Sequence, residues 1–108
     1  KQVCAIQLIG LCQRIFEEAK LDLFLQPYLI VSTGASSGLV QCLTDAISLD
    51  SLMKKPGFVS LQDHFLRTYG GADQRRFLRA QASFVSSLAA YSLVCYVLQI
   101  KDRHTGNV

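Results

Sequence analysis

The chain has 108 residues, of which 50% are hydrophobic and 18% are charged, and its formal net charge at pH 7 is +3. This length accommodates one small domain or part of a larger one, and the apolar fraction is high for a free-standing soluble unit. The basic residues are dispersed, without the dense basic stripe and aromatic stacking positions of a nucleic-acid-binding protein, so that class of function is excluded. We therefore expect a segment whose apolar faces pack against neighbouring parts of a larger domain.

The cysteines show neither close pairs nor histidine partners at metal-ligand spacing. They are Cys4, Cys12, Cys42 and Cys95. Each lies among apolar residues, where a free cysteine behaves as a small hydrophobic side chain. This pattern indicates a reducing compartment, and the first residues show no signal sequence.

The first half of the chain predicts a helix followed by a β-hairpin. Apolar residues recur at helical spacing over residues 2–20, which indicates an amphipathic helix. Residues 28–32 are apolar and β-branched and predict a strand, and residues 39–43 can return as a second strand. Residues 34–38 between them have turn chemistry, so the two strands are expected to pair as a hairpin.

The middle of the chain predicts two short elements. Residues 45–55 form a short helix or an irregular segment that ends at a Pro-Gly pair. Ser60, with Asp63 three positions later, is a helix start signal, and the helix is expected to continue through Arg67 to a pair of glycines.

The last predicted helix is long, covers residues 75–100 and has Asp73 as its N-cap. Its stretch 80–100 has no charged residue and is long enough to cross a bilayer. Arginine and serine residues on one side make its first half amphipathic, whereas residues 88–98 are nearly all apolar and predict a helix buried on every side. We interpret it as a core helix and not as a transmembrane span. The elements together predict an α+β fold.

Asp102 and Asn107 lie five positions apart directly after this helix, with Arg103 and His104 between them. Five is the spacing of the kinase catalytic loop, in which an Asp addresses the substrate hydroxyl and an Asn holds a metal ion. The alternative is a solvated helix end, since cations are favoured near the C-terminus of a helix. Phosphoryl transfer depends on positioning and charge neutralisation, which a carboxylate and a carboxamide on a short, anchored loop can provide.

The stretch from Ser87 to His104 resembles the catalytic-loop region of type III phosphatidylinositol 4-kinases, most closely the beta type. Lys101 directly before the aspartate is similar to the 4-kinases, whereas phosphoinositide 3-kinases and their protein-kinase relatives have Gly there. Residues 27–28, 37–40 and 63–66 agree with the same family, so the resemblance covers the whole chain.

The resemblance implies a partial kinase-like catalytic domain of α+β class. Residues 1–43 would be the end of the N-lobe with its helix, hairpin and hinge, and residues 44–108 would be the helical C-lobe up to the catalytic loop. The catalytic loop would comprise Gln99, Ile100, Lys101, Asp102, Arg103, His104, Thr105, Gly106 and Asn107. The ATP-binding hinge would comprise Val40, Gln41, Cys42 and Leu43.

The same resemblance assigns roles within these segments. Asp102, His104 and Asn107 are the implied catalytic residues, with Asn107 as the metal ligand. Either Asp102 or His104 takes the proton of the substrate hydroxyl, and spacing leaves this choice open. Arg103 is expected to be a structural ion-pairing residue, and Cys42 is either a hinge residue or a plain buried thiol.

The chain departs from the family pattern at several places. Thr105 replaces the usual Asn, and Gln41 replaces the usual Glu of the hinge. The helix that should present a Glu to the ATP-holding Lys has Gln2 or Val3 there instead. The glycine-rich loop, the ATP-holding Lys and the Asp-Phe-Gly metal site are not among these residues, so the 108 residues alone are expected to be inactive.

The implied reaction transfers the γ-phosphate of ATP to the 4-hydroxyl of phosphatidylinositol with Mg²⁺, or with Mn²⁺ in its place. The implied partners are the lipid at a membrane surface and the remaining kinase-domain segments, with no nucleic acid and no transmembrane span. The implied location is cytoplasmic and peripheral on intracellular membranes, as for Golgi enzymes. The alternatives are another phosphoinositide 3-kinase-related kinase and a truncated, non-catalytic helical interaction module.

Overall fold

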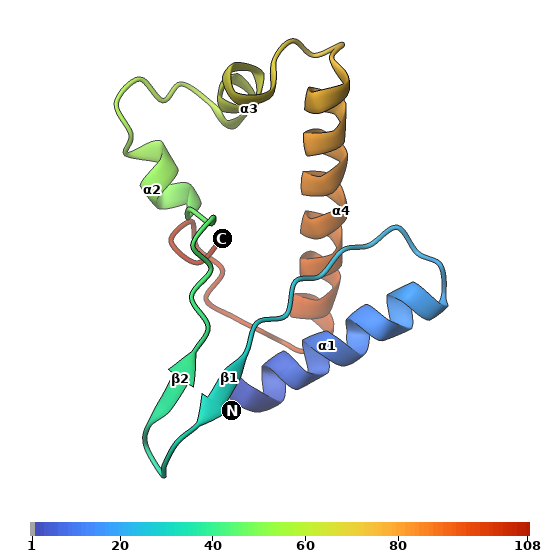
Figure 1. Ribbon diagram of the computed structural model, residues 1–108, viewed down its shortest axis with the longest axis vertical. Coiled ribbons are helices and arrows are strands. Elements are labelled where there is room, and N and C mark those ends of the chain that lie inside the picture. The colour runs from blue at the N-terminus through green and yellow to red at the C-terminus, as the bar shows by residue number, and fades with distance from the viewer. Residues whose placement is uncertain (1) are drawn as a thin grey trace.

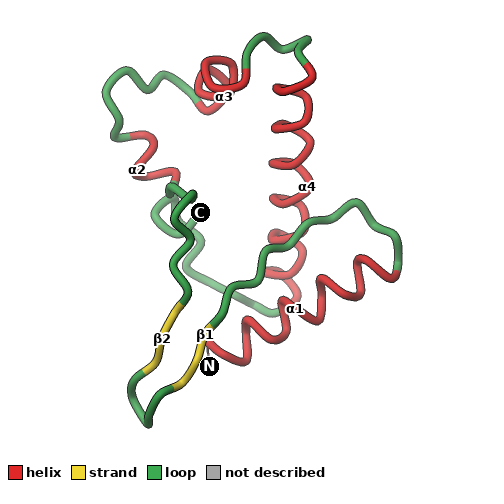
Figure 2. The backbone as a smooth tube through the Cα atoms, viewed as in Figure 1, coloured by secondary structure: helices red, strands yellow, loops and turns green. Residues whose placement is uncertain are grey.

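The computed structural model describes residues 2–108 of the protein and shows helices combined with a small antiparallel sheet, which confirms the predicted α+β class (Figure 1). In chain order the elements are α1 (Gln2–Glu18), β1 (Ile30–Ser32), β2 (Gly38–Val40), α2 (Leu49–Met53), α3 (Leu61–Tyr69) and α4 (Arg75–Val97). Helix α4 runs along one side, and α1 crosses near its C-terminal end (Figures 1 and 2). The hairpin begins with β1 beside α1 and extends away from α4.

The β-hairpin is present, but its strands are shorter than predicted. Ile30 faces Val40 at the base of the ladder, and Thr33 N–H donates to the Ser37 carbonyl at 3.0 Å across the turn. Beyond the ladder, Gln41 N–H still donates to the Leu29 carbonyl at 2.8 Å. The returning bond from Leu29 N–H goes to the Gln41 side-chain oxygen at 2.9 Å and not to a carbonyl, which ends the regular pairing.

Helices α1 and α4 both end two or three residues before the predicted position because the chain enters the left-handed region. Lys20 has a φ of 55° and Gln99 a φ of 53°. After α4, Ile100 N–H donates to the Cys95 carbonyl at 2.9 Å, and Gln99 N–H donates to the Tyr96 carbonyl at 3.3 Å. This is the Schellman arrangement, which usually has a glycine at the left-handed position. Neither end has a glycine, so the sequence did not signal it.

The helix starts follow the serine signals but not the aspartate signal. The Ser60 hydroxyl accepts from Asp63 N–H at 3.1 Å at the start of α3, as predicted, and Ser48 caps α2 in the same way. The predicted Asp73 cap of α4 is wrong, since the N-cap is Gln74 and it makes no side-chain capping bond. Asp73 lies one position too early to reach the free N–H groups of the first turn.

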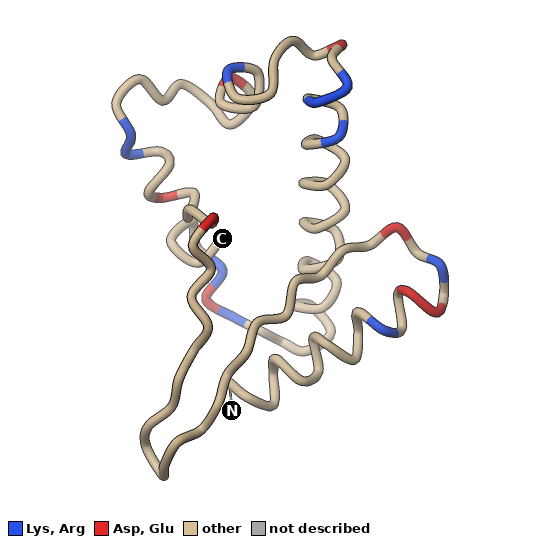
Figure 3. The backbone as a smooth tube through the Cα atoms, viewed as in Figure 1, with Lys and Arg blue, Asp and Glu red and all other residues tan. Residues whose placement is uncertain are grey.

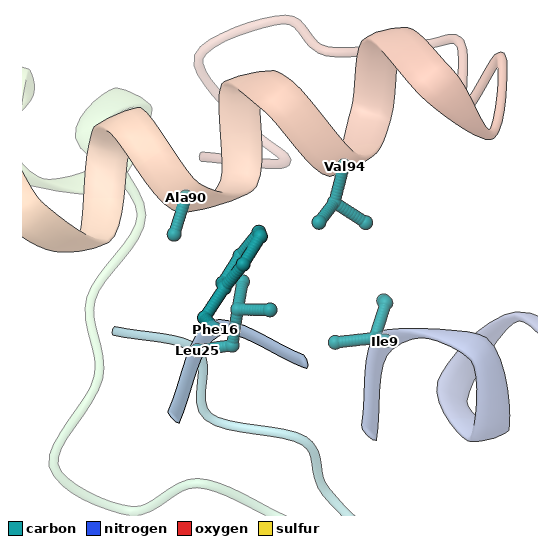
Figure 4. Close-up of a cluster of buried hydrophobic side chains, with 5 residues drawn as sticks. All are labelled: Ile9, Phe16, Leu25, Ala90 and Val94. Atoms are coloured by element: carbon teal, nitrogen blue, oxygen red, sulfur yellow. The ribbon is translucent and has the colours of Figure 1, made fainter. Parts of the chain in front are cut away.

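The core joins α1, the segment between α1 and β1, and α4. Its buried side chains are Ile9, Phe16, Leu25, Ala90 and Val94 (Figure 4). Ala90 is fully buried, and its small side chain lets Phe16 and Leu25 approach the surface of α4 closely. A separate contact joins α3 to α4, where the Phe65 and Phe84 rings lie 5.5 Å apart in an edge-to-face arrangement.

The chain leaves more surface exposed than a closed domain of its size. Its accessible surface is 8449 Å², whereas about 6,000 Å² is expected for a compact monomer of this mass. Its radius of gyration is 16.1 Å, against about 13 Å for a compact chain of this length. The prediction that residues 88–98 are buried on every side is wrong for the described chain, because only the stripe with Ala90 and Val94 is covered, and Tyr96 is 77% exposed.

Helix α4 is long and apolar enough to cross a membrane by length and composition alone, and only 11% of its apolar window is buried in the structure. A core helix of a soluble protein passes the same test, so this property by itself does not establish a span. The charged residues of α4 lie at its N-terminal end (Figure 3), and these residues, Arg75, Arg76 and Arg79, are exposed.

Tyr91 and Ser86 of α4 hold the segment between α1 and β1. The Tyr91 hydroxyl accepts from Gln26 N–H and donates to the Gln26 carbonyl, both at 3.0 Å. The Ser86 hydroxyl donates to the Asp22 carbonyl at 2.9 Å. Burial raises the pKa of Tyr91, the hydrogen bond with the Gln26 backbone opposes this, and nearby Tyr28 and Cys95 raise it further.

We expect Tyr91→Phe to lower the free energy of unfolding by about 1 kcal/mol at neutral pH, because both hydrogen bonds to Gln26 are lost. Because the folded pKa of Tyr91 lies above the unfolded value, its contribution is fully present below about pH 10 and is lost as the pH rises through the folded pKa. Urea denaturation at low protein concentration should therefore show the difference shrinking at alkaline pH. Tyr96→Phe, at an exposed tyrosine, is the control. A difference in the free energy of unfolding between the unchanged protein and Tyr91→Phe that stays constant with pH would contradict the raised pKa of Tyr91.

The isolated chain should self-associate, because its exposed surface includes apolar side chains that monomers normally cover. Light scattering should show species larger than a monomer, together with binding of a hydrophobic dye. Val85→Gln and Leu88→Gln, at exposed apolar positions of α4, should reduce association, whereas Ser92→Gln should not. A sharp monomer peak at high concentration with a cooperative thermal transition would contradict this expectation.

Candidate functional site

The predicted catalytic loop, residues 99–107, follows α4 and returns to α2 (Figures 1 and 2). At its start Ile100 packs against the core shared by α1 and α4. At its other end the Thr105 carbonyl accepts from Asp50 N–H at 2.9 Å, and the Val108 carbonyl accepts from Leu49 N–H at 2.8 Å. The loop is therefore held on both sides by elements distant in sequence.

The structure brings the three predicted catalytic side chains together within this loop. Asn107 Nδ2 donates to the Asp102 carbonyl at 2.9 Å and lies 3.3 Å from the Asp102 carboxylate oxygen Oδ2. His104 Nε2 lies 3.5 Å from Asp102 Oδ1. Asp102 has a φ of 63°, a left-handed conformation that aspartate tolerates better than most residues. All three side chains are exposed.

The hydrogen bonds of His104 indicate its tautomer. Gly106 N–H donates to His104 Nδ1 at 3.1 Å, so Nδ1 holds a lone pair and the proton of the neutral ring is on Nε2. The Nε2 proton then faces Asp102 Oδ1 at an N···O distance of 3.5 Å, which is an electrostatic contact and too long for a regular hydrogen bond. Asn107 Nδ2, 3.2 Å from Nε2, is also a donor in this arrangement, so this contact adds no hydrogen bond.

Arg103 and Lys101 add positive charge on either side of Asp102 (Figure 3). The ion-pairing role of Arg103 stays a prediction; within residues 2–108 its guanidinium donates to the Asn107 carbonyl at 3.3 Å. It closes the loop by binding its backbone. Electrostatically, the loop presents one carboxylate between two cations that face solvent.

The predicted hinge, Val40 to Leu43, is the end of β2 and the segment that follows it, and it is exposed throughout. The alternative of Cys42 as a buried thiol is wrong, because Cys42 is exposed. The Gln41 side chain accepts from Leu29 N–H and thereby fixes the hinge to the strand before it. A glutamate could accept the same bond, so the departure from the usual family residue conserves the geometry.

The donor atoms at the loop fit a magnesium ion in part. Asn107 uses its amide nitrogen toward Asp102, which leaves its carboxamide oxygen for a cation. Within residues 2–108 there is no cluster of three or more His, Cys, Asp or Glu side chains that could hold a metal ion. Because Mg²⁺ usually keeps several waters and takes only one or two protein carboxylates or amides, a single carboxamide oxygen suits it, but does not form a complete site.

Two shallow cavities lie away from the loop and from the hinge. One, of about 120 Å³, is bordered by Leu52, Phe58, His64 and Arg67. The His64 ring also meets the Phe65 ring edge-on, with ring centroids 6.3 Å apart. The other, of about 310 Å³, lies between Phe24 and α4.

Sequence reasoning missed the contribution of α2 to the loop. Leu49 and Asp50 act through their backbone N–H groups, which residue type does not report. The one available signal was Ser48, whose hydroxyl accepts from Ser51 N–H at 3.2 Å. This bond fixes the first residue of α2 and therefore the position of the free N–H groups that open the helix.

Comparison with known proteins finds one family and several similar proteins. The family described as phosphatidylinositol 3- and 4-kinase matches residues 1–108. Phosphatidylinositol 4-kinase of Dictyostelium discoideum is 46% identical over 105 residues, covering 96% of this chain and 9% of that protein. Phosphatidylinositol 4-kinase PIK1 of Saccharomyces cerevisiae is 39% identical over 122 residues, covering 100% of this chain and 11% of that protein.

Phosphatidylinositol 4-kinase beta of Sorex araneus is 40% identical over 108 residues, covering 100% of this chain and 13% of that protein. The chain thus spans between 9% and 13% of the length of these three relatives. Because the family match covers the chain from end to end, the chain belongs to the phosphatidylinositol 3- and 4-kinase family.

Proposed function

We propose that these residues form the central part of a phosphatidylinositol 4-kinase catalytic domain. The observation that carries the proposal is the single loop in which Asp102, His104 and Asn107 meet, packed at one end on the core and bonded at the other to α2. In this proposal residues 1–43 belong to the N-lobe and hinge and residues 44–108 to the C-lobe. Relatives named as phosphatidylinositol 4-kinases support the choice of lipid.

The proposed reaction transfers the γ-phosphate of ATP to the 4-hydroxyl of phosphatidylinositol. Bound Mg²⁺, or Mn²⁺, would neutralise phosphate charge, and the carboxamide oxygen of Asn107 would hold it. Asp102 is assigned the contact with the attacking hydroxyl. His104 is assigned an orienting role, because its Nε2 lies 3.5 Å from Asp102 Oδ1 while its Nδ1 accepts from Gly106 N–H.

The location of the reaction follows from its lipid substrate. We place the protein at the cytoplasmic surface of intracellular membranes, including the Golgi, where the exposed loop can reach the headgroup. In this proposal α4 packs within the C-lobe and does not span the bilayer, so its uncovered apolar face meets the remaining kinase-domain segments. Its position directly before the loop supports this, since Ile100 is part of the same core.

Catalysis can be tested in a chimera in which the 108 residues replace the matching segment of the Dictyostelium discoideum relative. Asp102→Ala and Asn107→Ala should each reduce kcat by at least about 10³-fold while nucleotide affinity stays within about twofold, because adenine is held at the hinge. Asn107→Ala should also change the dependence on Mg²⁺ concentration. Thr105→Asn is the control and should leave kcat unchanged, because Thr105 contacts α2 only through its backbone.

Near-normal turnover of the Asp102 and Asn107 variants would show that the loop is not catalytic, as expected for a non-catalytic interaction module. Phosphorylation at the 3-hydroxyl, or of protein in place of lipid, would point to another phosphoinositide 3-kinase-related kinase. Product analysis of the lipid headgroup distinguishes these outcomes.

The hinge assignment predicts where nucleotide protects the backbone. In the same chimera a non-hydrolysable ATP analogue should slow hydrogen exchange at Val40–Leu43, because the backbone groups of a kinase hinge bind adenine. Gln41→Glu should keep nucleotide affinity within about twofold, since either side chain can accept from Leu29 N–H. Protection elsewhere, with none at the hinge, would contradict the assignment.

A further inference from the structure

The first turn of α2 is the element that joins the hinge segment to the catalytic loop. Leu49 is only six positions after Leu43, the last residue of the proposed hinge. Its N–H donates to the Val108 carbonyl at 2.8 Å, and the next N–H, of Asp50, donates to the Thr105 carbonyl at 2.9 Å. These two bonds flank Asn107 and begin directly after His104, on the C-terminal side of the loop.

The amides are available because they open a helix. The first N–H groups of a helix have no partner within it, and the third one, of Ser51, is taken by the Ser48 hydroxyl at 3.2 Å. The remaining two therefore point outward and bind the loop carbonyls. The Asp50 carboxylate is engaged elsewhere, with Lys54 at 2.6 Å, so its contribution to the loop is that of its backbone.

The loop needs such support because its own bonds are exposed. The contacts among Asp102, His104 and Asn107 are all on the surface, where a single hydrogen bond contributes about 1 kcal/mol or less. Ile100 fixes the loop only at its start. Without the second attachment, the segment after Arg103 would be anchored by nothing outside the loop itself among the described contacts.

We propose that Leu49 and Asp50 are positioning residues whose backbone N–H groups set the catalytic loop relative to the ATP hinge. This inference rests on the proposed kinase function. A displacement of about 1 Å of a catalytic group can cost about 10²-fold in rate, so loss of these bonds lowers turnover without removing any side chain that touches substrate.

Proline substitution tests this, because proline removes the N–H and is tolerated in the first turn of a helix. The chain offers a matched pair. Leu49 and Leu61 are each the first residue of a helix, each follows a capping serine in extended conformation, and each is half-buried. Leu49→Pro removes a bond to the loop, whereas Leu61→Pro removes an N–H for which no loop contact exists.

In the Dictyostelium chimera, Leu49→Pro should lower kcat by about tenfold or more relative to Leu61→Pro, with KM for ATP and Tm matching that control. Hydrogen exchange at residues 101–107 should be faster in Leu49→Pro only. Asp50→Pro, compared with Gln62→Pro, should behave in the same way, whereas Asp50→Ala keeps the N–H and should keep kcat.

Proline variants with kcat and loop exchange equal to those of their controls would overturn the inference. Loss of activity in Asp50→Ala equal to that in Asp50→Pro would also overturn it, because the carboxylate would then be responsible. The kcat of Asp102→Ala is measured in the same chimera as a reference for the proposed function. If that variant is inactive while Leu49→Pro is normal, the positioning role fails and the proposed kinase function stands. If Asp102→Ala is active, the proposed function itself fails.

Discussion

The packing of α1 and the segment after it onto one stripe of α4 is the contact on which the rest of the structure depends. Ala90 and Val94 are almost completely buried beneath Phe16 and Leu25, and the Tyr91 hydroxyl on the same face holds the backbone of Gln26. The small side chain of Ala90 permits this close approach. Fixing the C-terminal half of α4 in this way also fixes where the following loop begins.

The proposed site is therefore a loop supported from two directions. Ile100 belongs to the core, and the amides of Leu49 and Asp50 bind the far side. Within the loop the contacts are exposed and individually weak, so they select a conformation only because both ends are already placed. This arrangement explains how Asp102 can be kept in the left-handed region, a conformation that costs energy and persists only where the surrounding structure imposes it.

The open shape of the chain also follows from the packing of α4. One stripe of α4 is covered by this chain, and most of its remaining apolar surface is not. The exposed surface and the radius of gyration exceed those of a compact chain of equal length. In the proposed function, the remaining kinase-domain segments cover that face.

The sequence by itself determined the features that depend on neighbouring residues: the amphipathic α1, the hairpin turn, the Ser60 cap and the spacing of Asp102 and Asn107. These signals act over a few positions, so composition and spacing report them. The tertiary structure decided which face of α4 is buried, where α4 ends and what holds the loop. Those outcomes depend on backbone amides and on side chains dozens of positions away, which a local pattern cannot specify.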